Sequence, residues 1–362
     1  MSKAAELASL IGNINAGGGG VNRNCVINGD MSVSQRATSV SSITGAGYAV
    51  LDRFRLGGAV PGTWTWSQST TVPSSQGFGN SLKLDCTATG SAGSMYIQHK
   101  MEGQNLQGFA KGTSDAKPFA LSFWVRSNKT GTYIAQLLDN DNTRHVSKSY
   151  TISSANTWEH KKITFPADTT GAFGNDNGAS LEIYLWLSAD SSNSSGTLAT
   201  TWASVTAANN AVGQVNLADS TDNEWYITGL QLEIGQNPTE FEHEPFDVTL
   251  RKCQRYYAHT YGYGNTVGAA FDQSYNGMIY LIGTGNHGCS VEWKFPVEMR
   301  ATPTVDLYGH AGTKNRITYW NGSEATYNAL NRTTSQLTGF DLGTGSSADD
   351  YYSAGCVAQS EL

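Results

Sequence analysis

Alternation of apolar and polar residues is the dominant pattern in the middle of the chain, from residue 115 to residue 235. It is clearest in three segments of this stretch, at 119–127, 181–187 and 224–235. Side chains that alternate with period two are typical of a strand with one buried face, whereas an amphipathic helix repeats about every 3.6 residues. No segment of this stretch keeps a helical period. The pattern therefore predicts a β-sandwich as the core of the chain.

On two of these predicted strands, large aromatic and charged side chains occupy the face turned away from the core. They are Trp124, Arg126, Glu182, Tyr184 and Trp186. Contiguous exposed aromatic side chains usually mark a binding surface. One explanation is a platform for sugar rings, and another is an interface with a second subunit, where Trp, Tyr and Arg are favoured. The third is coverage by a neighbouring loop, and we expect an interface or a loop before a sugar. The same question applies to Trp64 and Trp66.

The clearest helical pattern lies in residues 1–16. Apolar residues there recur at intervals of three and four positions, at Ala4, Leu7, Ile11 and Ile14. A stripe of barely two heptads is marginal in water and needs copies of itself or a partner to pack against. We expect a helix that forms an oligomerisation bundle or an anchor in a larger assembly, with a frayed terminus as the remaining alternative. The glycines at 17–20 then act as a flexible joint.

A second series of alternating segments occupies the last third of the chain. A short helix is predicted at 246–257, after Pro245. Strand-like segments separated by glycine-rich turns follow it, at 267–271, 278–282, 289–295, 304–308 and 351–358. These segments predict a second, smaller β-sandwich.

The composition agrees with an all-β protein. Among the 362 residues are 40 glycines, 17 tyrosines and 9 tryptophans, and charged residues make up only 15%. Glycine suits frequent turns and aromatic residues favour strands. The length exceeds that of one small domain and suits two or three.

Charge, cysteines and apolar runs argue against several kinds of partner and site. The formal net charge of −7 argues against nucleic acid, because phosphate binding needs a clustered basic surface. The 5 cysteines are widely spaced, so we expect free thiols rather than a zinc site or a complete disulfide framework. The chain begins with no long apolar run, and no segment reaches the length of a membrane span. We therefore expect neither a signal peptide nor membrane insertion.

Motifs for catalysis are absent from the sequence. There is no zinc-protease helix, phosphate-binding loop, dinucleotide fingerprint or serine-hydrolase elbow. The run Glu242-His243-Glu244 predicts a solvated charged turn. The acidic and amide runs at 139–142 and 175–178 resemble calcium loops only faintly, and we expect hairpin turns there. Hydrolysis of a glycan needs two carboxylates about 5–9 Å apart, and the sequence identifies no such pair. We expect no enzymatic activity and no cofactor.

Four segments in a fixed order carry a resemblance to known proteins. They are residues 21–36 with NxxINGDMxxxQR, residues 48–54, residues 225–246 with WYITGLQLEIGQNPTEFEHEPF, and residues 250–257 with LRKCQRYY. This series resembles tail fibres and receptor-binding proteins of tailed bacteriophages, as do the segments at 293–305 and 349–362. The middle of the chain, with PFALSFWVRSNKTGTY at 118–133, is similar to jelly-roll carbohydrate-binding modules attached to glycosidases.

The resemblance implies four regions in an all-β chain with a short N-terminal helix. They are a helical anchor and linker at 1–20, a jelly-roll domain at 21–245, a helical connector at 246–257 and a distal β-sandwich at 258–362. Relatives with the jelly roll often carry one structural calcium ion, which is left open here with no residue assigned. Contacts with a receptor are expected from aromatic residues of the distal domain. They are Tyr261, Tyr263, Tyr275, Tyr319, Trp320 and Tyr327.

The function that the resemblance implies is attachment of a phage to its host. The protein would be a homotrimeric virion subunit, made in the host cytoplasm and joined to tail proteins through its N-terminus. It would bind surface polysaccharide or lipopolysaccharide without cleaving it. One alternative is a structural virion protein, such as a tail adaptor, head fibre or decoration protein, with no receptor role. Another is a tailspike that depolymerises a glycan.

Overall fold

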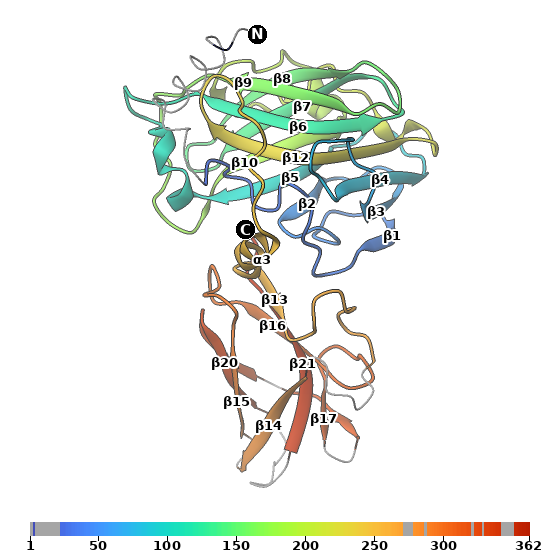
Figure 1. Cartoon of the computed structure of the whole chain (residues 1–362), viewed down its shortest axis with the longest axis vertical. Helices are drawn as coiled ribbons and strands as arrows, with labels where there is room; N and C mark the ends of the chain where they lie inside the picture. Colours follow the sequence, from blue (N-terminus) through green and yellow to red (C-terminus); the bar gives the residue numbers. More distant parts are fainter. Residues whose placement is uncertain are drawn as a thin grey trace. The chain divides into compact units, whose positions relative to one another are not determined.

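The computed structural model describes residue 3 and residues 22–270, 278–285, 288–319, 322–327, 329–341 and 351–362 (Figure 1). The predicted N-terminal helix, with Ala4, Leu7, Ile11 and Ile14, lies outside the described residues. The chain divides into two compact units. The first comprises residues 1–32, 38–245 and 362, and the second comprises residues 33–37 and 246–361. Both are built mainly of antiparallel strands, which confirms the all-β prediction.

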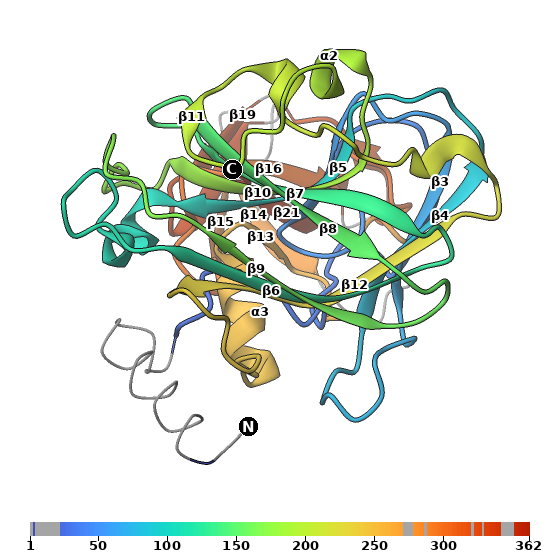
Figure 2. The same ribbon diagram turned by 90° about the horizontal axis from the view of Figure 1, so that it is seen from above.

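The first unit is a sandwich of two six-stranded antiparallel sheets (Figure 2). The first, sheet A, has the order β1 (Ser39–Ile43), β3 (Thr63–Ser69), β4 (Ser81–Ala88), β12 (Glu224–Ile234), β6 (Phe119–Ser127) and β9 (Glu159–Phe165). The second, sheet B, has the order β11 (Ala203–Ser204), β8 (Arg144–Ile152), β7 (Gly131–Asp139), β10 (Ala179–Ser188), β5 (Met95–Glu102) and β2 (Phe54–Gly58).

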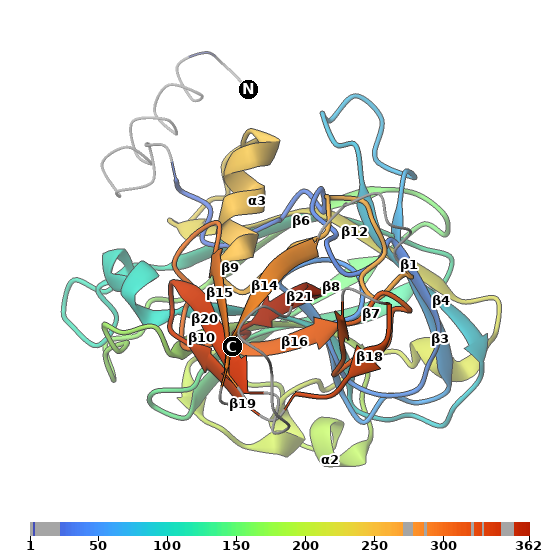
Figure 3. The ribbon, with the colours of Figure 1, turned by 90° about the horizontal axis from the view of Figure 1, so that it is seen from below.

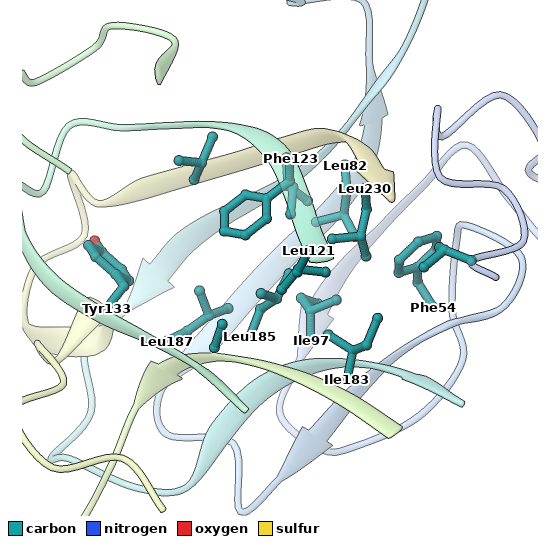
Figure 4. Close-up of a cluster of buried hydrophobic side chains, with 14 of the residues drawn as sticks. Phe54, Leu82, Ile97, Leu121, Phe123, Tyr133, Ile183, Leu185, Leu187 and Leu230 are labelled. Carbon is teal, nitrogen blue, oxygen red and sulfur yellow. The ribbon is translucent and has the colours of Figure 1, made fainter. Parts of the chain in front are cut away.

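The core of this unit lies between the inner faces of the two sheets. Figure 4 shows Leu121 and Phe123 of β6 on the same side of their strand as the core, with Ile183 and Leu185 of β10 across from them. Phe123 is completely buried and Leu185 is 1% exposed. Period-two alternation therefore identified the inward side chains correctly. Trp64 and Trp66 of β3 are also completely buried in this core. Neither of them offers a surface for binding.

The connections between the strands of the first unit contain short helical turns, which are too short to form a layer of their own. They are η1 (Gly103–Asn105), η2 (Gln107–Phe109), α2 (Ser191–Ser194), η3 (Ala207–Asn209) and η4 (Leu217–Asp219). The last three belong to the long connection between β10 and β12. No helix in the described part of the chain is long and apolar enough to cross a membrane.

The segment before β1 is bonded to the second half of β12. The side-chain oxygen of Asn24 accepts a hydrogen bond from the backbone N–H of Leu232 (3.1 Å), and the carboxylate of Glu242 accepts one from the N–H of Asn24 (2.9 Å). The N–H of Leu230 donates to the carbonyl of Gly29 (2.9 Å). A Cβ on Gly29 would lie 2.1 Å from the carbonyl oxygen of Leu230, so a side chain cannot fit there. Residues of the two quoted motifs thus hold these segments together.

The second unit begins with a helix, α3 (Phe246–Gln254), and continues as one sheet. Its described strands are β13 (Tyr257–His259), β14 (Met278–Gly285), β15 (Gly288–Lys294), β16 (Thr304–Tyr308), β17 (Ile317–Tyr319), β18 (Glu324–Ala325), β19 (Ala329–Arg332), β20 (Gln336–Asp341) and β21 (Tyr351–Gln359). Figure 3 shows β21 between β14 and β16, and it pairs with both. β21 also pairs with β13 and β17.

Most strands predicted for this unit are present, but the described residues 267–270 form a turn instead of a strand. The unit also includes residues 33–37, which the predicted domain ranges placed with the jelly roll. The Gln35 side-chain amide donates to the carbonyl of Tyr257 (2.8 Å), and the Arg36 guanidinium lies 2.8 Å from the Glu361 carboxylate. The same guanidinium lies over the ring of Tyr257, 3.8 Å from its centroid. The Gln-Arg end of the first motif therefore serves the packing of the second unit.

Candidate functional site

A hollow of about 270 Å³ lies on the outer face of sheet A, where β6, β9 and β12 run side by side. Strand residues form part of its lining, and residues from two loops, at 75–78 and 240–243, complete it. We call it the sheet A hollow. Ligand clefts usually measure roughly 300–1,000 Å³. The sheet A hollow falls just below that range and suits one ring-sized group better than an extended ligand.

One wall of the hollow is a stacked pair of rings from neighbouring strands. Trp124 of β6 and His160 of β9 are register partners, and their rings lie 4.8 Å apart at 8°. Burial, together with the nearby charge of Lys162, lowers the pKa of His160. The imidazole is therefore neutral at neutral pH, with one nitrogen that donates and one that accepts a hydrogen bond. This wall offers both aromatic surface and hydrogen bonds.

A second wall is a cluster of three rings from the two loops. Phe78 lies 5.1 Å from both Phe241 and His243, and these two lie 4.9 Å from each other. The cluster depends on Gly229, which stands at a bulge in β12 between Thr228 and Gln231. Gly229 has a φ of +64°, and a Cβ there would lie 2.6 Å from the ring of Phe78. A glycine at this bulge therefore allows Phe78 to pack directly on the strand.

The polar side chains around the hollow are available to a ligand. Ser75, Gln76, Glu240 and His243 all line it and are exposed. In the part of the chain that the structure describes, neither the Gln76 amide nor the Glu240 carboxylate has a protein hydrogen-bond partner. Aromatic walls and free donors and acceptors together suit a ligand that has an apolar face and a rim of hydroxyl groups.

The lining contains a single carboxylate, that of Glu240. Acid–base hydrolysis of a glycosidic bond generally requires two. Among the described residues, no group of three or more His, Cys, Asp or Glu side chains is arranged to hold a metal ion.

Of the residues predicted on the outward strand faces, two lie on sheet A. Trp124 lines the hollow. Arg126, two residues further along β6, lies over the ring of Tyr226 (4.8 Å) and donates from Nε to the carbonyl of Asn156 (3.0 Å). It also lies 3.5 Å from the Glu224 carboxylate. Arg126 is thus bonded to neighbouring residues and does not line the hollow.

Trp186 belongs to the outer face of sheet B and is only 1% exposed. Its indole N–H donates to the side-chain oxygen of Gln136 (2.8 Å), and Gln136 in turn donates to Asn210 (2.9 Å). Ala211 and Leu198 from the connection between β10 and β12 pack in the same cluster. Of the three explanations for this aromatic residue, coverage by a loop is the one that applies.

Glu182 and Tyr184 also lie on the outer face of sheet B. Tyr184 is half-buried and stacks on Tyr96 (4.3 Å, 5°). Burial, with the nearby Glu182 charge, raises the pKa of Tyr184. The Glu182 carboxylate accepts hydrogen bonds from the side-chain amides of Gln98 and of Asn140 (2.7 Å), and Lys100 lies 3.6 Å away. The Glu182 carboxylate is thus bonded to neighbouring polar side chains of the protein.

The aromatic residues predicted for receptor contact in the second unit do not share one kind of environment. Tyr261 is 5% exposed and belongs to a small buried cluster, whereas Tyr263 is 45% exposed. Tyr319 and Tyr327 pack against the core of this unit. Tyr275 and Trp320 lie outside the described residues. Tyr261 is therefore excluded as a surface contact. The exposed Tyr263 ring packs on Phe246 (5.1 Å), and its hydroxyl accepts a hydrogen bond from the N–H of Ser34 (3.1 Å).

Sequence reasoning missed most of the hollow. Phe78 and His160 carry no local signal, because only the fold brings them together, whereas Phe241 lies within the quoted motif at 225–246. Gly229 did carry one, since an isolated glycine within a strand pattern indicates a bulge or a close backbone approach. His243 lies in the run predicted as a charged turn and does line the hollow.

No protein-family model matches the sequence, and no curated protein matches it. Three solved structures illustrate what the fold is similar to. A tailspike domain of bacteriophage CBA120 is 17% identical over 59% of this chain and 21% of its own, with a TM-score of 0.32. TmCBM61, solved with β-1,4-galactotriose, is 10% identical over 50% of this chain and 88% of its own (TM-score 0.28). A family 11 carbohydrate-binding module from a Clostridium thermocellum cellulase is 12% identical over 60% and 96% (TM-score 0.27).

The matched part is thus about a fifth of the tailspike domain and most of each binding module. At these identities and TM-scores, the likeness concerns the fold alone.

Proposed function

We propose that this chain binds a glycan without cleaving it, and that the sheet A hollow holds one sugar ring. The observation that carries this proposal is the combination of two aromatic walls with unbonded polar side chains around a single space of about 270 Å³. A pyranose has a face of C–H groups that can lie against an aromatic ring. Its hydroxyl groups can then bond with Gln76, Glu240 and the neutral imidazole of His160.

The proposed setting is the tail fibre of a bacteriophage. The ordered series of segments that resembles phage tail fibres supports it, and residues 1–20 would attach the chain to tail proteins or to its own copies. One ring-sized site binds weakly. A homotrimer repeated around a tail can raise avidity by about 10²–10⁴ when the sites engage together. Surface polysaccharide or lipopolysaccharide of the host is the proposed ligand.

A pair of tryptophan substitutions tests the position of the site. Trp124→Ala removes one wall of the hollow, whereas Trp158→Ala removes a half-buried indole nearby that packs on Tyr226 (6.2 Å) and does not line the hollow. Binding of the purified proteins to host cells and to their extracted polysaccharide is measured. We expect Trp124→Ala to weaken binding about tenfold or more, equivalent to about 1.4 kcal/mol, and Trp158→Ala to leave it within twofold.

Tyr184→Ala on sheet B completes the comparison. If this variant loses binding while Trp124→Ala keeps it, the site lies on sheet B and the proposed position is wrong. If the wild-type chain binds no host glycan but is incorporated into particles, the structural alternative is correct. Release of oligosaccharides from the polysaccharide would establish the depolymerising alternative.

A further inference from the structure

The first unit contains a lysine whose side chain is completely buried. The Nζ of Lys111 lies 2.6 Å from a carboxylate oxygen of Asp139 and 3.0 Å from one of Asp168. It donates hydrogen bonds to the carbonyl oxygens of Thr170 (2.9 Å) and Gly171 (2.8 Å). The exposed fraction of its side chain is 0%. We call these four oxygens and the space between them the Lys111 cage.

Burial of a charged group is costly unless partners replace the lost water. The cage supplies them in the form of two carboxylates and two carbonyl dipoles. Two aromatic rings close it, those of Phe173 and Trp202, each with its centroid 5.3 Å from Nζ. Burial opposes ionisation of Asp168, but hydrogen bonds from Arg144 and Lys111 outweigh it and lower the pKa of that carboxyl.

The donor set of the cage is the one that hard metal cations prefer. Calcium is bound by carboxylate and carbonyl oxygens in flexible arrangements completed by water, whereas magnesium demands a compact octahedron. Asp139 is also the first residue of the acidic run at 139–142. Asp139 is the last residue of β7, and the rest of the run lies in the hairpin turn to β8, as predicted from the sequence. The Asp139 carboxylate contacts a cation supplied by the chain itself.

We propose that the Lys111 ammonium is a built-in cation, and that loss of its side chain converts the cage into a site for a divalent metal ion, calcium rather than magnesium. The wild-type fold then has no need of a metal at this position. Arg144 binds both oxygens of Asp168 (2.8 and 3.1 Å) and neutralises part of its charge. We therefore expect a dissociation constant of roughly 0.1–1 mM for calcium in the variant, comparable with extracellular calcium modules.

The test uses the full chain with Lys111→Ala and two readouts. Terbium luminescence reports binding directly, because the Trp202 indole lies beside the cage and can sensitise the ion. The thermal midpoint is measured in EDTA, in magnesium and in millimolar calcium. We expect the variant to melt below the wild type in EDTA, to recover several degrees in calcium, to respond less to magnesium and to show sensitised terbium emission. The thermal midpoint of the wild type should not depend on calcium or magnesium, and the wild type should show no sensitised terbium emission.

Two controls isolate the cage. In Lys111→Ala combined with Asp139→Asn, the calcium response should disappear, because one of the two carboxylates is lost. Lys129→Ala removes a partly exposed lysine that pairs with Asp219, and it should behave as the wild type does. Lys111→Met fills the cage with an apolar chain of similar length and should also lack the response.

A folded Lys111→Ala protein without sensitised terbium emission or a calcium-dependent midpoint would overturn the proposal. The proposal is also overturned if Lys111→Met folds but Lys111→Ala stays unfolded in calcium. A calcium ion bound in the cage should replace the charge of the lost ammonium and restore the fold. An equal calcium response in the wild type or in Lys129→Ala would place the ion elsewhere. These outcomes do not depend on whether the chain binds a glycan.

Discussion

Trp124 on sheet A and Trp186 on sheet B both point outward from the middle of a strand, yet only Trp124 meets a hollow. Trp186 is 1% exposed because the connection between β10 and β12 folds over it, with Ala211 in contact and Asn210 bonded to Gln136. Over sheet A, the loops at 75–78 and 240–243 stand around Trp124 and leave a space. The alternation of a strand thus shows which way a side chain points, whereas the loops decide whether that side chain is free.

One carboxylate beside each face shows the same difference. On sheet B, the Glu182 carboxylate is bonded to Gln98 and Asn140 and lies near Lys100. On sheet A, the Glu240 carboxylate is exposed at the rim of the hollow. Polar groups that satisfy one another stabilise a fold, and those with free capacity can bind a ligand. The proposal therefore places the ligand on sheet A.

The largest expected effect is on stability, from Trp186→Ala. Removal of a buried tryptophan costs about 3–5 kcal/mol of the free energy of unfolding, and it also removes the hydrogen bond that Trp186 donates to the side-chain oxygen of Gln136. Trp124→Ala should cost less than half as much, because Trp124 is half-buried. Urea unfolding of both variants measures the difference. Equal costs for the two substitutions would show that the loop does not protect sheet B in the way described.

Gly229→Ala should have the next largest effect. The new Cβ would lie 2.6 Å from the ring of Phe78, at a φ of +64°. We expect the free energy of unfolding to fall by about 2–3 kcal/mol because of backbone strain and displaced packing. Glycan binding should also weaken, because the aromatic wall shifts. Urea unfolding and polysaccharide binding measure the two effects.

Gly213→Ala is the matched control for strain alone. Gly213 has a φ of +89°, but the nearest atom to a new Cβ there is a methyl carbon of Thr132 at 3.9 Å. Its loss of unfolding free energy should be about 1 kcal/mol smaller than that of Gly229→Ala. It should bind the polysaccharide as strongly as the wild type does. Equal losses in both variants would mean that contact with Phe78 does not matter.

The sequence predicted the sandwich because one-sided burial leaves a period-two pattern in each strand, as in Leu121 and Phe123. It could not predict the hollow in the same way. Phe78, Trp124 and Phe241 are far apart in the chain, and only the pairing of strands brings them together. Coverage by a loop was one of the explanations that the sequence allowed for Trp186. The sequence could not identify Ala211 as part of the cover, because Ala211 lies in a connection without periodicity. The positions of loops depend on tertiary contacts that leave no local pattern.

The quoted motifs raise a different difficulty. Asn24, Gly29 and Glu242 recur in the resemblance, and the structure shows them bonding segments before β1 to the end of β12. Gln35 and Arg36 pack within the second unit. In this chain, these motif residues therefore hold segments together within each unit. Phe78 and His160, which line the hollow, lie outside these motifs. Other lining residues lie within the motif at 225–246, namely Gly229, Glu240, Phe241 and His243.

Acidification should have an intermediate effect. Burial lowers the pKa of His99 well below its ordinary value of 6.5, and burial also lowers that of His145 on sheet B. For each histidine, the unfolded chain binds more protons than the folded chain at a pH between the folded-state pKa and the unfolded-state pKa. This contribution to stability is therefore present above pH 6.5 and is lost as the pH falls. Urea unfolding at pH 7.5 and pH 5 should show the loss, and it should be smaller in His145→Gln. A drop that is unchanged in this variant would exclude His145 as a source.

The smallest expected effect belongs to Arg126→Ala, which tests the limit of the hollow on its own sheet. Arg126 lies two residues from Trp124 on the same face of β6, but it contacts Tyr226, Glu224 and Asn156 instead of the hollow. Partly exposed ion pairs contribute about 0–1 kcal/mol to the free energy of unfolding. We therefore expect a loss within that range and glycan binding within twofold of the wild type, whereas Trp124→Ala should lose about tenfold. If Arg126→Ala lost binding as strongly, the ligand would extend along the strand toward Tyr226, and the site would be a groove across sheet A instead of a space for one ring.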